Sequence, residues 1–134
     1  MKRKRVLDSY AMLAYLNKEK GFDSVRQALS DAQSSGINIL MNQINVGETF
    51  YILYRKRGKD KANYFLETIL AGLPIVHVAN TFDLVIEAAL IKAGYPISFA
   101  DCFSVCTAAR ENAVIMTGDP EFRRVEHLVD IEWI

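Results

Sequence analysis

The stretch Ile115-Met116-Thr117-Gly118-Asp119-Pro120 joins an apolar run to a turn that begins with an acid. Residues 113–117 have the pattern of a short strand buried on both faces, as in a parallel sheet. Asp119 before Pro120 is typical of a helix N-cap followed by a first-turn proline. A buried strand that passes directly into a helical turn indicates an α/β protein. The acid then lies beyond the carboxyl end of the strand, where open parallel sheets place their active crevices.

Short strands and helices alternate along the rest of the chain. The pattern predicts strands at 5–8, 37–41, 74–78, 113–117 and 129–134, the last at an edge of the sheet. It predicts helices that begin at 8 or 9 and that span 23–34, 45–57, 60–71, 81–93 and 98–112. This order of elements is that of a parallel α/β sheet.

Length and composition indicate one domain that spans residues 1–134. The chain is 51% hydrophobic, so it can bury a core of its own. Sixteen Lys and Arg balance sixteen Asp and Glu, so any binding to a polyanion must come from local patches. Cys102 and Cys106 have no partner at a metal-binding spacing, and we expect them to be small buried packing groups in a reducing compartment.

The amino-terminal sequence shows no targeting segment. Residues 1–5 have the positive charge of a secretory signal, but only Val6 and Leu7 follow before Asp8, so there is no apolar region of the required length. No stretch approaches the roughly 18 apolar residues that span a bilayer. We therefore expect a cytoplasmic protein with no membrane association.

Four acids lie at strand–helix junctions or inside predicted helices. They are Asp8, Glu48, Asp101 and Asp119. Three of them have a simpler explanation, because Asp8, Asp101 and Asp119 can each stabilise the start of a helix. Four such positions in one architecture favour a carboxylate cluster that binds metal, since like charges brought together raise one another's pKa unless a cation compensates.

Glu48 is the acid that helix capping does not explain. Its neighbours at helical spacing are mostly apolar: Ile44, Asn45, Tyr51 and Ile52. An unpaired charge on an apolar face is costly, so the pattern predicts that Glu48 is neutralised by protonation, a basic side chain or a cation.

Four short motifs together resemble the PIN domain family, and within it the VapC-type toxins of toxin–antitoxin pairs. The motifs are Val6-Leu7-Asp8-Ser9, Asn45-Val46-Gly47-Glu48, Ser98-Phe99-Ala100-Asp101 and Thr117-Gly118-Asp119-Pro120-Glu121-Phe122. The resemblance spans nearly the whole chain. It implies a three-layer α/β/α sandwich around a short, mainly parallel sheet, and it implies metal-dependent endoribonuclease activity. It also implies homodimerisation and a small antitoxin whose tail blocks the acidic site from a nearby groove.

On this resemblance the four acids take the family's acidic positions, and Ser9 and Thr117 match its nearby hydroxyl positions. Oxygen ligands without Cys or His suit one or two Mg²⁺ or Mn²⁺ ions, which can activate water for in-line attack on a phosphodiester. We expect Asp8, Asp101 and Asp119 to be ligands. Glu48 can ligate a second ion or orient the attacking water, and Ser9 and Thr117 can hydrogen-bond the carboxylates or the waters.

RNA must be held by groups outside this acidic cluster. The densest basic run is Arg55-Lys56-Arg57 with Lys59 and Lys61, and further cations are Arg110 and Arg123-Arg124. We expect Arg55, Arg57 and Arg123 to contact substrate, although ordinary helix-end charge also explains them. The start, Lys2 to Arg5, has the pattern of a solubilising tail, and His77 and His127 have no catalytic partner at a recognisable sequence spacing. The aromatics Tyr10, Tyr15, Tyr51, Tyr54 and Phe65 are expected in the core or an interface, and an exposed one can stack on unpaired bases.

Two other classes of function compete with the nuclease. One is a PIN-like RNA- or protein-binding module without cleavage activity, in which the acids only cap helices. The other is a phosphotransfer enzyme such as a haloacid-dehalogenase-like phosphatase, which needs a second Asp that Asp8-Ser9-Tyr10 lacks, or a receiver domain, whose paired acids and late Lys are also missing. Cleavage of DNA instead of RNA remains an open alternative within the nuclease chemistry.

Overall fold

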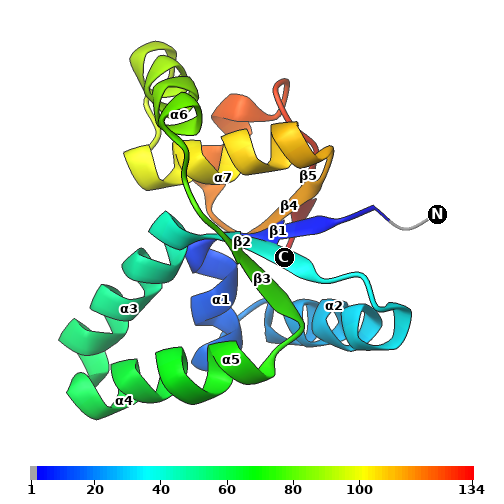
Figure 1. The fold of residues 1–134 in the computed structure, drawn as a ribbon, viewed down its shortest axis with the longest axis vertical. Coiled ribbons are helices and arrows are strands. Elements are labelled where there is room, and N and C mark those ends of the chain that lie inside the picture. Colours follow the sequence, from blue (N-terminus) through cyan, green and yellow to red (C-terminus); the bar gives the residue numbers. More distant parts are fainter. Residues whose placement is uncertain (1–2) are drawn as a thin grey trace.

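Five short parallel strands form the central sheet in the order β3-β2-β1-β4-β5. The computed structural model describes residues 3–134, shown in Figure 1. The strands are β1 (Arg5–Leu7), β2 (Ile39–Asn42), β3 (Ile75–Val78), β4 (Val114–Thr117) and β5 (Ile131–Trp133). Because all five strands are parallel, their carboxyl ends meet at one edge of the sheet.

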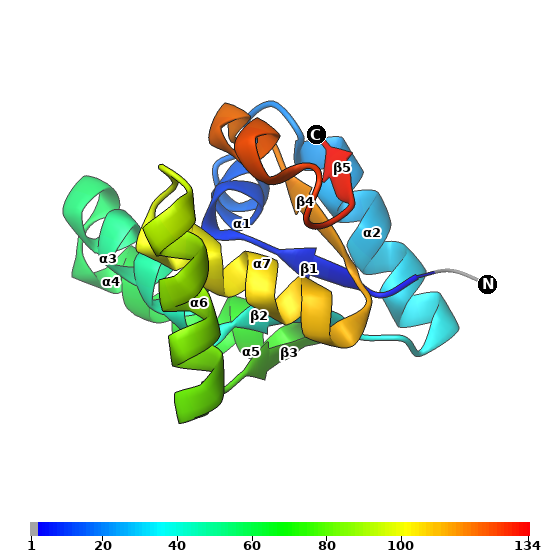
Figure 2. The same cartoon turned by 90° about the horizontal axis from the view of Figure 1, so that it is seen from above.

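Helices cover both faces of the sheet, which makes three layers (Figures 1 and 2). One layer holds α1 (Ser9–Leu16), α2 (Phe22–Ser35), α3 (Gln43–Arg57), α4 (Lys59–Tyr64), a π-helical turn (Phe65–Ile69) and α5 (Leu70–Gly72). The other layer holds α6 (Phe82–Gly94), α7 (Phe99–Glu111) and the 3₁₀ turn η2 (Pro120–Val125). The three-layer α/β/α fold that the resemblance implied is thus confirmed. No helix within residues 3–134 is long and apolar enough to cross a bilayer.

Two of the three inner strands, β1 and β4, supply side chains to a separate core on each face. Val6 and Ile115 pack in the cluster on the α6–α7 side, whereas Leu7 and Met116 pack in the cluster on the α1–α3 side. This alternation follows from the two-residue period of a strand. Because β1 and β4 are buried on both faces, their sequences are continuous apolar runs, as the sequence pattern indicated.

The predicted elements are all present, with one difference inside a helix. The strand predicted last is the edge strand β5, and Gly58 ends α3 with φ 91° as expected of a helix stop. The helix predicted at 60–71 is not a uniform α-helix, since a π turn at Phe65–Ile69 separates α4 from α5. Apolar periodicity does not distinguish the two hydrogen-bond patterns, because a π turn adds only one residue to the helix.

The position of the candidate site follows from the strand order, because the chain leaves β1 toward one side of the sheet and later adds β4 on the other side. From β1 the chain goes to β2 on one side, whereas β4 pairs with β1 on the other side. Open α/β sheets have a crevice beyond the carboxyl ends of two such strands. Asp8 directly follows β1, and Asp119 lies two residues after β4.

Candidate active site

Asp8 is the most deeply buried acid at the carboxyl edge of the sheet, with 1% of its surface exposed. Its Oδ1 accepts a hydrogen bond from the Ala11 backbone N–H at 2.8 Å, so Asp8 is the N-cap of α1. Its Oδ2 accepts a hydrogen bond from the Thr117 hydroxyl at 2.5 Å. Thr117 Oγ1 also accepts from the Asp119 backbone N–H at 3.0 Å. One threonine at the end of β4 therefore links the acid after β1 to the acid after β4.

Asp101 and Asp119 reach the same place from α7 and from the loop after β4. Asp101 lies in the first turn of α7, where its N–H donates to the hydroxyl of the N-cap Ser98 at 3.2 Å. Asp119 caps η2 through a 3.0 Å bond from the Glu121 N–H. Carboxylate oxygens of Asp101, Asp119 and Glu121 all lie within 4.8 Å of one another.

Glu48 approaches from α3, on the opposite layer to α7. It is half-buried, and its Oε1 accepts a short hydrogen bond from the Ser9 hydroxyl. The side chains around Glu48 are mostly apolar as expected, but Ile44 and Tyr51 are 40% and 47% exposed, so this face is partly open to solvent. Helical spacing shows which residues share a face but not whether that face is covered.

Burial raises the pKa of both Asp8 and Asp101 to about 7. Desolvation is the main cause for each, because it disfavours the charged carboxylate. Hydrogen bonds from Thr117 and Ala11 partly oppose the rise at Asp8, and the charges of Asp101 and Asp119 add to it. At Asp101 the hydrogen bond with Ser98 opposes the rise, while the charges of Asp119, Glu48 and Glu121 add to it. Electrostatic repulsion thus connects five neighbouring acids: Asp8, Glu48, Asp101, Asp119 and Glu121.

The chemistry of this donor set fits a divalent cation. All five side chains offer carboxylate oxygens, the ligands that Mg²⁺ and Mn²⁺ prefer. Among the described residues, none of the ion pairs between basic side chains and acids involves any of these five. Hydroxyl and backbone N–H donors orient the carboxylates without neutralising them, so a cation would relieve their mutual repulsion.

The basic residues considered as substrate contacts lie in different parts of the structure. Arg55 lies over the Tyr51 ring at 5.3 Å, and Arg57 lines hollows between α1, α3 and α4. Arg123 lies over the Trp133 ring at 4.8 Å and pairs with Glu126. Arg110 is bonded to Glu87 of α6 through two 2.9 Å hydrogen bonds.

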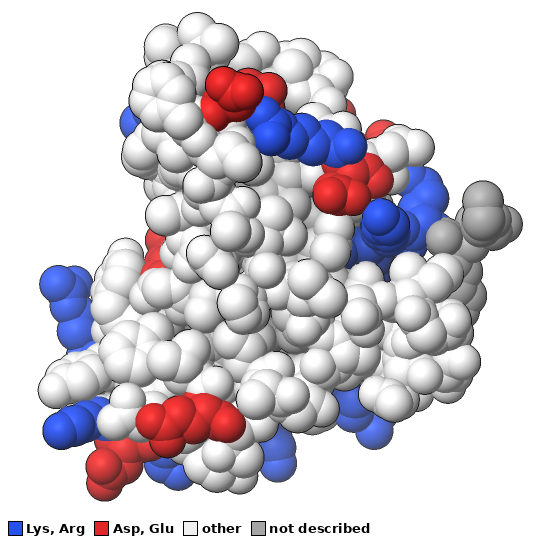
Figure 3. All heavy atoms as spheres, viewed as in Figure 1, with Lys and Arg blue, Asp and Glu red and all other residues white. Residues whose placement is uncertain are grey.

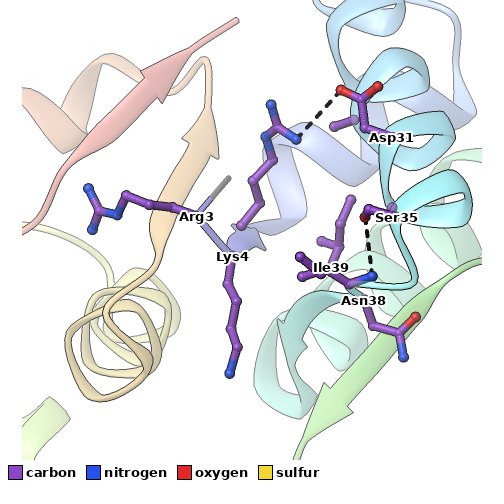
Figure 4. Close-up of a pocket in the computed structure, with 10 residues that line it drawn as sticks. Arg3, Lys4, Asp31, Ser35, Asn38 and Ile39 are labelled. Carbon is purple, nitrogen blue, oxygen red and sulfur yellow. Dashed lines mark hydrogen bonds and ion pairs between the residues drawn. The ribbon is translucent and has the colours of Figure 1, made fainter. Parts of the chain in front are cut away.

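The basic start of the chain is not a free tail within the described residues. Arg3, Lys4 and Arg5 pair with Asp130, Glu111 and Glu132, and Arg5 is part of β1. Lys2 lies outside the described residues. Arg3 and Lys4 border a hollow of only about 20 Å³ at the amino ends of the strands, away from the acids (Figure 4).

Two groups of residues differ from what the sequence suggested. Glu121 received no role, although its place two residues after Asp119 was the available signal. Tyr10, Tyr51 and Tyr54 are 40–48% exposed and not part of the core, whereas Phe65 is buried as expected. Tyr10 lies against Gly118, where a Cβ would overlap its ring. Cys102 and Cys106 are buried and unpaired, as predicted.

The sequence profile of the PIN domain matches residues 5–128. The chain belongs to the PIN domain family. Its three-layer α/β/α fold is therefore that of a PIN domain, and membership of this family supports a nuclease. A search of curated protein sequences found no significant match.

Solved structures with a similar fold include three from toxin–antitoxin work. VapBC2 from Rickettsia felis, bound to a DNA fragment from its promoter, has a TM-score of 0.74 at 19% identity over 96% of this chain and 97% of that chain. DNA-bound VapBC from Salmonella typhimurium has a TM-score of 0.75 at 18% identity, over 98% of each chain. Mycobacterium tuberculosis VapC20, a sarcin–ricin loop cleaving toxin, has a TM-score of 0.70 at 17% identity over 91% of this chain and 95% of that chain. At these identities the likeness concerns the fold.

We expect the metal-free PIN domain to lose stability as the pH rises from about 4 to 8. A carboxyl whose folded-state pKa lies above its unfolded value binds its proton more tightly in the folded state. The stabilisation from Asp8 and Asp101 is therefore complete below the unfolded pKa and is lost as the pH passes about 7. Urea unfolding in EDTA at several pH values measures the loss, which should amount to a few kcal/mol.

Asp101→Asn should flatten this pH dependence, because the amide cannot ionise. Exposed Asp23 on α2 provides a control in Asp23→Asn, which should leave the dependence unchanged. An equal slope in Asp101→Asn and in the unsubstituted protein would contradict the assignment. Addition of Mn²⁺ should restore stability at pH 8 more than at pH 5, since the cation competes with protons for the carboxylates.

Proposed function

We propose that the protein is a divalent-metal-dependent endoribonuclease, the toxin of a type II toxin–antitoxin pair. The observation that carries this proposal is the meeting of Glu121 with four acids, which lie after β1, on α3, on α7 and after β4. None of these acids pairs with a basic side chain of residues 3–134. Membership of the PIN domain family supports a nuclease. The fold shared with VapC20, a sarcin–ricin loop cleaving toxin, supports RNA as the substrate.

Mg²⁺ or Mn²⁺, as one or two ions, would supply an activated water and positive charge opposite the scissile phosphate. Asp101, Asp119 and Glu121 would hold the cation, because their oxygens already converge. Asp8 would complete this set, since it lies close enough to feel the charges of Asp101 and Asp119 and its orientation is fixed by Thr117 and Ala11. Glu48, held by Ser9, binds a second ion or orients the attacking water.

Purified protein should cleave a mixed structured-RNA pool only when Mn²⁺ or Mg²⁺ is present. Asp8→Asn and Asp101→Asn should each slow cleavage about a hundredfold or more, because metal catalysis contributes several kcal/mol to the barrier. Both variants should stay folded, since Asp8→Asn keeps an oxygen that can cap α1 and each substitution removes only a charge that is costly when buried. Product analysis by gel with and without EDTA measures the rate.

Asp23→Asn on exposed α2, purified in parallel, is the matched control and should cleave normally. Equal cutting by Asp8→Asn and the unsubstituted protein would identify a contaminating nuclease. No cutting by any of them would favour a PIN-like RNA- or protein-binding module instead. The observation behind that second reading is that Asp8 and Asp119 also cap helical turns.

Arg55 and Tyr51 are the substrate contacts that the geometry supports best. Glu48, Tyr51 and Arg55 recur at spacings of three and four on α3, so they share one side of the helix. The exposed ring can stack on an unpaired base, and the guanidinium can contact phosphate. Arg57 and Arg123 are assigned weaker contacts, because Arg57 lines another face and Arg123 already has two partners.

Arg55→Ala should weaken RNA binding about fivefold or more in the cleavage-deficient Asp8→Asn background. It should also lower the salt dependence of binding, because about one phosphate contact is lost. Fluorescence anisotropy of a labelled single-stranded RNA measures both quantities.

Arg26 on α2 is a close control, since it lies 5.9 Å over the Phe22 ring in the same arrangement, four residues apart. Arg26→Ala should leave RNA affinity unchanged. A similar loss of affinity in both variants would show that general surface charge, not the α3 side, holds the RNA.

An exposed apolar row on α6 supports homodimerisation. Phe82, Ile86 and Leu90 are spaced four apart and are 45–76% exposed. Figure 3 shows a largely uncharged surface over β3, which precedes α6 in the chain. A contiguous apolar surface of this kind is typical of a protein interface, and we assign it to a second copy of the chain. Sedimentation equilibrium measures the dimer, and a monomer at all concentrations would exclude it.

A groove near the acids supports a small antitoxin partner. Adjoining hollows lie beside α1, α3 and α4, the largest of about 360 Å³. The largest shares Leu13 and Glu19 with one neighbouring hollow, which reaches Tyr10 next to Ser9. It shares Asn17, Leu53 and Arg57 with the other neighbouring hollow. Their apolar side chains, together with basic side chains that outnumber the one acid, Glu19, suit an apolar tail with acidic groups. Stoichiometric inhibition of cleavage by the partner would test this assignment, and unchanged cleavage would contradict it.

A further inference from the structure

Asn45 is a fully buried residue of α3 whose side chain is bound to α7. Its Nδ2 donates to the Ala100 carbonyl at 3.2 Å, and its Oδ1 accepts from the Ser104 hydroxyl at 2.8 Å. Ala100 immediately precedes Asp101, and Ser104 lies one helical turn after it. A single side chain therefore holds both ends of the α7 turn that carries Asp101.

The Asn45 side chain does not cap α3, the helix to which it belongs. Asn45 is the third residue of α3, a position from which a side chain often bonds back to the N-cap. Here Asn42 caps the helix through the Ile44 N–H, and the Asn45 amide is committed to α7. Glu48 lies one turn further along α3, on the same side as Asn45.

We infer that Asn45 is a positioning residue that sets the distance between Glu48 and Asp101 and thereby tunes divalent-cation affinity. The inference rests on the proposed function, because it takes the acidic cluster as a cation site. Repulsion between the two carboxylates pushes α3 and α7 apart, and the buried bonds of Asn45 oppose this separation. Preorganised carboxylates bind a cation more tightly, because less of the binding free energy is lost in assembling them.

A second pair of residues provides an internal comparison. Asn42 Nδ2 donates to the Thr107 hydroxyl of α7 at 3.1 Å, and both residues are buried like Asn45 and Ser104. Thr107 lies one turn beyond Ser104 and therefore two turns from Asp101. Ser104→Ala and Thr107→Val each delete one buried α7 hydroxyl that bonds an asparagine, but only Ser104 flanks Asp101.

The test compares Mn²⁺ affinity and metal-free thermal stability in the full chain. Electron paramagnetic resonance of free Mn²⁺, above pH 7, gives the dissociation constant, and EDTA-treated samples give the melting temperature. Ser104→Ala should weaken Mn²⁺ binding about tenfold, the scale seen when groups that orient metal ligands are removed. Thr107→Val should lower the melting temperature about as much as Ser104→Ala does. It should nevertheless change the Mn²⁺ dissociation constant by less than about twofold. Asn45→Leu, which removes both bonds at nearly equal volume, should weaken binding at least as much as Ser104→Ala.

Equal Mn²⁺ constants for Ser104→Ala, Thr107→Val and the unsubstituted protein would overturn the inference and leave the proposed function standing. Absence of Mn²⁺ and Mg²⁺ binding by the unsubstituted protein would overturn the proposed function, and the inference with it. If Asn45→Leu does not fold, Ser104→Ala still decides, because it removes a single hydroxyl.

Discussion

Burial of neighbouring carboxylates at the carboxyl edge of the sheet is the constraint on which the rest of this structure depends. Asp8 has almost no exposed surface, and its pKa rises to about 7 because the charged form is desolvated. Asp101 experiences the same effect from the α7 side. Folding must bring these groups together against their repulsion, so their neighbours have to fix them in place without removing the charge that a cation requires.

Neutral donors meet this requirement. Thr117, Ser9 and Ser98 supply hydroxyls, and the starts of α1 and η2 supply backbone N–H groups. Basic side chains pair with acids elsewhere, as in the bond between Arg110 and Glu87 on the surface of α6 and α7. The site is therefore ordered and remains negatively charged. Helix capping and metal binding are not exclusive explanations for Asp8, because one oxygen caps α1 while the other faces Thr117.

Much of the architecture could be predicted because local patterns carry it. Apolar runs identified β1 and β4, and Gly58 marked the end of α3. The π turn at Phe65–Ile69 could not be predicted, since its apolar spacing matches an α-helix over so few residues. Tyr10 and Tyr51 were expected in the core or an interface and lie outside the core, since helical periodicity identifies a common face without showing what covers it. Glu121 was overlooked for a related reason, because its proximity to Asp101 depends on the path of η2.

The sequence by itself determined the alternation of strands and helices, the caps and the presence of four acids in motifs that resemble the PIN domain. These features follow from hydrogen bonding and apolar periodicity over a few neighbouring residues. Only the tertiary structure decided which acids converge, that Glu121 joins them, and that Asn45 holds α3 against α7. The physical reason is distance along the chain: Asp8 and Thr117 are 109 residues apart, and their contact exists only because β1 and β4 pair in one sheet.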